Sequence, residues 1–135
     1  MKYWLMKSEP DAWSWDQQVK KGVEPWSGVR NYQAANNMKS MALGDRAFFY
    51  HSNIGKEIVG IVEIVRLYYP DPSDNTGKFG MVDVKAVKPF KKPVSLADIK
   101  TILALKNMAL LKQSRLSVSP VTEDEWDVIT KRGGV

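Results

Sequence analysis

The spacing of apolar residues along the chain predicts about five strands and about four short helices. Residues 57–67 are apolar on both faces, which indicates a central, buried strand. Gly60 in this segment is expected to allow a close backbone approach or a bulge. The expected strands cover residues 2–7, 46–51, 57–67, 81–87 and 116–118.

Capping patterns locate the helices. Ser14 and Gln17 have the spacing of a capping box, and Gly22 is expected to close the short helix that they open. Capping signals predict further helices over residues 95–103 and 122–133, and apolar residues at helical spacing, followed by Gly44, predict one over residues 31–43. Loops are expected over residues 23–29, 52–56 and 69–77. Strand pairs joined by hairpins, with helices at the ends, favour a mixed α+β fold around a small barrel over a doubly wound sheet. No repeat or linker interrupts the pattern, so residues 1–135 are expected to form one domain.

Composition narrows the classes of function. The 44% apolar and 26% charged residues are typical of a globular protein and exclude a disordered chain. No apolar run is long enough to cross a bilayer, so a soluble, cytoplasmic protein without a membrane partner is expected. The absence of cysteine excludes disulfides and thiolate chemistry. The net charge of +5 suits a polyanionic partner, although it is weak evidence alone.

Tryptophan carries the strongest functional signal. The chain has five, and Trp26 lies in a Pro-Trp-Ser-Gly loop before Arg30, Asn31 and Tyr32. A flat ring beside such hydrogen-bonding side chains is what reading a splayed-out base requires. The alternative is that Trp26 pins the loop onto the core. Trp13 and Trp15 are expected to be structural.

The sequence lacks most of the motifs that mark enzymes and metal sites. The acidic segment 71–75 lacks the glycine and glutamate of a calcium loop, so a solvated turn is favoured and no metal or cofactor is expected. The single histidine, His51, is either a structural residue or a rim contact for a ligand. One alternative function is a small hydrolase or nucleic-acid-modifying enzyme that uses His51 with Asp45 or Glu63, and another is an adaptor for a protein or small molecule. The lysines near the end of the fourth strand are either a solvated face or contacts to a phosphate backbone, for which Lys88, Lys91 and Lys92 are the candidates.

Several segments together resemble a known family. They are residues 3–10 (Tyr-Trp-Leu-Met-Lys-Ser-Glu-Pro), 26–34, 44–45, 49–53 and 116–121. On these segments the chain resembles the EVE domain family, which belongs to the PUA-like superfamily with the YTH and ASCH domains. The resemblance implies a PUA-like barrel of five to six strands flanked by short helices. It also implies a non-catalytic pocket, in a monomer, for a modified cytosine or adenine in DNA or RNA.

The resemblance also implies site residues. Trp26 resembles one wall of an aromatic cage, and Lys7, Ser8 and Ser27 resemble hydrogen-bonding residues at its edge. Where the family usually has a proline and a tryptophan, this chain has Phe79-Gly80-Met81, so Phe79 or Tyr69 is expected to complete the pocket. The full set of expected base-binding residues is Lys7, Ser8, Trp26, Ser27, Arg30, Asn31, Tyr32, His51, Ser52, Asn53, Tyr69, Phe79 and Ser117.

Overall fold

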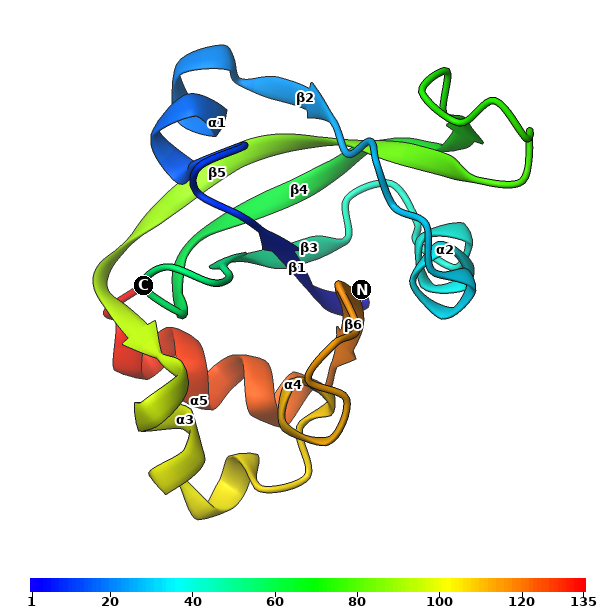
Figure 1. Ribbon diagram of the computed structural model, residues 1–135. Coiled ribbons are helices and arrows are strands. Elements are labelled where there is room, and N and C mark those ends of the chain that lie inside the picture. The colour runs from blue at the N-terminus through cyan, green and yellow to red at the C-terminus, as the bar shows by residue number, and fades with distance from the viewer.

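A curved sheet of six strands forms the centre of the computed structural model, which describes residues 1–135 (Figure 1). The strand order is β2-β5-β4-β3-β1-β6, in which β1 and β3 are parallel and every other pair is antiparallel. The edge strands β2 and β6 do not pair with each other, so the barrel is open. The strands are β1 (Tyr3–Ser8), β2 (Val23–Pro25), β3 (Arg46–His51), β4 (Glu57–Pro70), β5 (Gly80–Ser95) and β6 (Val118–Val121).

Five α-helices and one 3₁₀ turn cover the two faces of this sheet, which confirms the mixed α+β, PUA-like architecture expected from the sequence. They are α1 (Trp15–Lys21), α2 (Tyr32–Lys39), α3 (Leu96–Thr101), η1 (Leu103–Leu105), α4 (Ala109–Lys112) and α5 (Glu123–Gly133). In Figure 1, α3, α4 and α5 lie together below the sheet, whereas α1 lies above it. No helix is both long and apolar enough to pass through a lipid bilayer.

Two apolar clusters form because successive residues of a strand point to opposite faces. In β1, Met6 joins a cluster with residues of α1 and α2, whereas Leu5 joins a cluster with residues of α3 and α5. In β4, Val62 and Ile61 divide between the clusters in the same way. This strand lies between β5 and β3, which confirms the prediction of a central strand that is buried on both faces.

The capping signals are confirmed. The Ser14 hydroxyl accepts a hydrogen bond from the Gln17 backbone amide, and the Gln17 side-chain oxygen accepts one from the Ser14 backbone amide. Both halves of the capping box are therefore present. Asn31 caps α2 through a 2.9 Å hydrogen bond from the Ala34 amide. Gly60 is confirmed as a point of close approach, because a β-carbon there would lie 2.5 Å from the Trp15 ring.

Five elements differ from the prediction, and for the four strands among them the reason is pairing between distant segments. The expected loop 23–29 begins with β2, which exists because it pairs with residues 83–85 of β5. The last strand is Val118–Val121 rather than 116–118, in register with residues 3–6 of β1. Both β4 and β5 continue beyond their expected ends because they pair with each other along their whole length. Helix α2 ends at Lys39, not near residue 43.

Candidate functional site

A cavity of about 440 Å³ lies between the end of β1 and the segment around β2. Its volume is within the range of roughly 300–1,000 Å³ that is typical of small-molecule sites. One wall comes from β1 and the loop that follows it, and the other comes from β2 and the loop after it. The lining residues are Lys7, Ser8, Glu9, Ala12, Trp13, Glu24, Pro25, Trp26, Ser27 and Gly28, and we call this space the tryptophan cavity.

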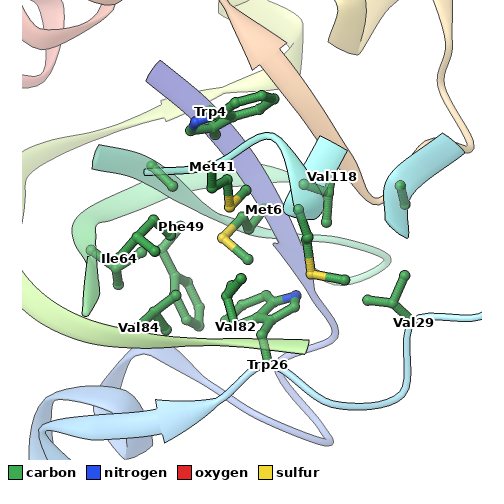
Figure 2. Close-up of a cluster of buried hydrophobic side chains, with 14 of the residues drawn as sticks. Trp4, Met6, Trp26, Val29, Met41, Phe49, Ile64, Val82, Val84 and Val118 are labelled. Carbon is green, nitrogen blue, oxygen red and sulfur yellow. The ribbon is translucent and has the colours of Figure 1, made fainter. Parts of the chain in front are cut away.

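Trp26 belongs both to this cavity and to the core. Its side chain points from the segment after β2 into the apolar cluster, where Val82 lies beside it (Figure 2). Its ring meets Phe49 edge to face at 5.5 Å, and only 7% of the residue is exposed. The two interpretations of Trp26 from the sequence are therefore not exclusive. The core covers most of the ring, and the rest of the side chain lines the cavity.

The second aromatic residue of the cavity is Trp13, which the sequence assigned to structure alone. Its indole nitrogen donates to the Gln18 side chain at 2.9 Å. The fully buried Gln18 donates in turn to the carbonyl oxygens of Gly22 and Val84, at 3.0 and 3.3 Å. The Ser8 hydroxyl donates to the Trp13 carbonyl. These contacts hold the half-buried Trp13 in position beside the cavity, and the only signal for it in the sequence is the excess of tryptophan.

Positively and negatively charged side chains line the tryptophan cavity. The Lys7 ammonium donates to the carbonyl oxygen of Ser114 at 2.6 Å, and burial lowers the pKa of this group. The Glu9 carboxylate accepts from the Asn53 side chain at 3.0 Å, and Glu24 forms an ion pair with Lys21. The cavity therefore offers one cationic donor and two carboxylate acceptors beside its aromatic surfaces.

The loop that carries Trp26 is held by Asp71, a residue that the sequence placed in a solvated turn. Asp71 is buried, and its carboxylate accepts from the Gly28 amide at 2.8 Å and from the Arg30 guanidinium at 3.3 Å. Burial alone would raise the pKa of Asp71, but hydrogen bonds from Ser73, Gly28 and Arg30 outweigh it and lower that pKa. Gly28 has a φ of +84°, which suits glycine at this turn. Asp71 is thus a positioning residue for the cavity wall.

Of the expected site residues, Lys7, Ser8, Trp26 and Ser27 line the tryptophan cavity, and several others lie one layer behind its wall. Asn53 orients Glu9, as described above. The Ser52 amide donates to the Ser8 carbonyl at 2.9 Å, and the Lys7 amide donates to the Ser117 carbonyl at 2.8 Å. These three residues support the wall without lining it.

His51 also lies behind the wall, at the start of α1. Its Nε2 accepts from the Trp15 amide at 3.0 Å, which requires a neutral imidazole. Burial lowers the pKa of His51, although Glu57 and Asp16 act to raise it. The dyads considered for an enzyme do not form, because Asp45 precedes the first residue of β3 and His51 is the last, roughly 20 Å apart at strand spacing. Glu63 pairs with Arg46 at that same distant end.

The remaining expected residues lie outside the tryptophan cavity. Tyr32 is 62% exposed, and its ring lies against that of Phe79, with the centroids 4.9 Å apart and the planes tilted by 36°. The Arg30 guanidinium lies 5.9 Å from the Phe79 ring. The Asn31 side chain caps α2. Tyr69 donates to Asp83 and lies under the Arg66 guanidinium, so neither Phe79 nor Tyr69 faces Trp26 across the cavity.

The three lysines expected to contact phosphates, Lys88, Lys91 and Lys92, lie on β5 beyond its pairing with β2. None of them lines the tryptophan cavity. No group of three or more acidic or histidine side chains is arranged to hold a metal ion.

Comparison with known proteins agrees with this architecture. A solved protein from Rhodopseudomonas palustris is 60% identical and superimposes with a TM-score of 0.94, covering 99% of this chain and 94% of that one. Human THYN1, solved in complex with DNA that contains 5-methylcytosine, is 35% identical with a TM-score of 0.88 and covers 100% of this chain and 99% of that one. Thymocyte nuclear protein 1 of Rattus norvegicus is 38% identical over 94% of this chain and 71% of its own length. The model of the EVE domain matches residues 2–132, and the chain belongs to the EVE domain family.

Proposed function

We propose that this protein is a non-catalytic reader that binds DNA by taking one modified base, of the 5-methylcytosine class, into the tryptophan cavity. The observation that carries the proposal is the pair of tryptophans, Trp13 and Trp26, lining one cavity with Lys7 and two carboxylates. The DNA complex of human THYN1 supports DNA over RNA as the first ligand to test.

The chemistry of the cavity fits a cytosine ring. Stacking on an aromatic side chain contributes about 1–3 kcal/mol per base. A carboxylate such as that of Glu9 or Glu24 can accept a hydrogen bond from the exocyclic amino group of cytosine. The Lys7 ammonium can donate to the acceptor atoms of the same ring. Trp13 and the uncovered part of Trp26 thus supply affinity, and the polar side chains supply selection among bases.

The methyl group sets the expected size of the preference. Burying one carbon against apolar surface contributes about 0.8 kcal/mol, which corresponds to a roughly fourfold change in affinity. We therefore expect the protein to bind 5-methylcytosine at least about fourfold more tightly than cytosine in the same sequence. A single reading domain of this kind is expected to bind without turnover.

The experiment measures fluorescence anisotropy of short labelled oligonucleotides that differ only in one cytosine, methylated or not, as single strands, duplexes and RNA. Trp13→Ala should lower affinity for the methylated strand about five- to 150-fold through loss of stacking. Phe79→Leu is the matched aromatic control and should keep the preference for the methylated base, because Phe79 lies outside the cavity.

Three results would refute parts of this proposal. Equal affinity for methylated and unmethylated strands removes the modified base as ligand. An effect of Phe79→Leu as large as that of Trp13→Ala removes the tryptophan cavity as the site. Tighter binding to the RNA strand than to either form of DNA would reassign the partner to RNA.

A further inference from the structure

A second cavity of about 360 Å³ lies between the start of α2 and the loop that follows α4. It is lined by Asn31 and Gln33 on one side and by residues 112–116 on the other. Lys112 and Arg115 are exposed there, and neither takes part in any of the four ion pairs of the structure. No acidic residue lines this space, which we call the cationic cavity.

The two cavities are neighbours along both of their walls. Ser27 and Gly28 line the tryptophan cavity, and Asn31 and Gln33 of the same chain segment line the cationic cavity. On the opposite wall, Lys7 lines the tryptophan cavity, and its ammonium donates at 2.6 Å to the carbonyl oxygen of Ser114, which lines the cationic cavity. The two cavities are therefore adjacent, joined through the contact between Lys7 and Ser114.

The charges that line the two cavities suit different parts of a nucleotide: the tryptophan cavity suits the base and the cationic cavity suits the phosphates. Two carboxylates, Glu9 and Glu24, and one ammonium, Lys7, line the tryptophan cavity, so it is a poor place for a phosphate. The cationic cavity offers two positive side chains that form no ion pair, together with the side-chain amides of Gln33 and Gln113. All four groups can donate hydrogen bonds to phosphate oxygens. A strand with one base in the tryptophan cavity would leave its phosphates on the cationic side.

We propose that the cationic cavity binds the phosphates that flank the inserted base, with Lys112 and Arg115 as the contacting cations. This proposal rests on the proposed function, because it takes the ligand to be a nucleic-acid strand. It moves the phosphate contacts away from Lys88, Lys91 and Lys92. Those lysines line neither cavity, and the Lys91 side chain lies against Gly134 near the end of α5.

The test compares two variants that remove the same charge. One is the double variant Lys112→Gln and Arg115→Gln, and the matched control is Lys88→Gln and Lys91→Gln. All four side chains are exposed, so the melting temperature of both variants should stay close to that of the wild type. Affinity for methylated and unmethylated single strands is measured by anisotropy at several KCl concentrations.

Lys112→Gln with Arg115→Gln should weaken binding to both strands by the same factor, leaving the methylation preference intact. It should also flatten the slope of log affinity against log salt by up to about 1.4, at about 0.7 for each phosphate contact in a single strand. The control should leave that slope unchanged. An equal change of slope in both variants would mean a general effect of net charge and would overturn the proposal, as would an unchanged slope in the first variant.

The two proposals can fail separately. If the wild type does not distinguish the methylated strand, the proposed function fails, but the salt slope on the unmethylated strand still tests the cationic cavity. A wild type that binds no oligonucleotide overturns both proposals.

Discussion

Replacement of Trp26 by alanine should affect folding more than any change of an exposed side chain at the site. The residue is 7% exposed, lies in the apolar cluster with Met6 and Val82, and packs edge to face on Phe49 at 5.5 Å. Truncation of a buried tryptophan to alanine costs about 3–5 kcal/mol of unfolding free energy. The backbone hydrogen bond from the Trp26 amide to the Val82 carbonyl, at 2.8 Å, survives the change. The loss therefore comes from the side chain alone.

For a domain of 135 residues, each kcal/mol of stability corresponds to a shift in melting temperature of about 3–5 °C. Trp26→Ala should accordingly melt about 10–25 °C below the wild type, measured by circular dichroism. Trp26→Phe keeps an aromatic ring in the cluster and should melt between the two. Trp13→Ala is the comparison from the other wall of the cavity, and its half-buried ring should cost less stability while still lowering affinity for the methylated strand. A Trp26→Ala protein that melts within about 3 °C of the wild type would contradict the placement of this ring in the core.

Three further predictions follow from contacts around the cavity. Gly60→Ala should destabilise the protein by about 1–3 kcal/mol, because its β-carbon would lie 2.5 Å from the Trp15 ring. Urea unfolding should show a smaller loss of stability for the same change in a Trp15→Leu background, and equal losses in both backgrounds would contradict the clash. Asp71→Asn should lower the unfolding free energy by about 1–3 kcal/mol and speed hydrogen exchange at the Gly28 amide, and unchanged exchange at that amide would argue against the anchor. The lowered pKa of His51 means that the unfolded chain binds this proton more readily, so stability should fall as the pH drops from about 6.5 towards the folded pKa. Urea unfolding between pH 5 and 8 should lose this dependence in His51→Gln, and a slope that persists there must come from another group.

The elements that the sequence predicts well are those with local causes. The capping box at Ser14 depends on side chains within three residues of the amides that they bind, so the pattern of residues suffices. The central strand β4 is evident because both of its faces are apolar. Strand β2 has no such signal, because its three residues become a strand only by pairing with β5.

In the candidate site, too, the residues that the sequence predicts are those with local signals, and the others depend on long-range contacts. Trp26 and Ser27 are evident from the composition of their loop and from the family resemblance. The position of Trp13 depends on Gln18, whose own partners lie at Gly22 and Val84, and no local pattern records that arrangement. The role of Asp71 likewise depends on a contact across 43 residues of sequence to Gly28.

The position of β1 has a consequence for the order in which the chain folds. The antiparallel strands β3, β4 and β5 are consecutive in the sequence and can pair as soon as they meet, which is fast because the intervening loops are short. Strand β1 pairs on one side with β3, and on the other side with β6, whose residues lie more than a hundred positions further along the chain. Until residues 118–121 arrive, one edge of β1 exposes unpaired amides and carbonyls to neighbouring chains. During synthesis on a ribosome the chain therefore carries an open sheet edge, on the strand that supplies Lys7 and Ser8 to the tryptophan cavity, until residues 118–121 have been made.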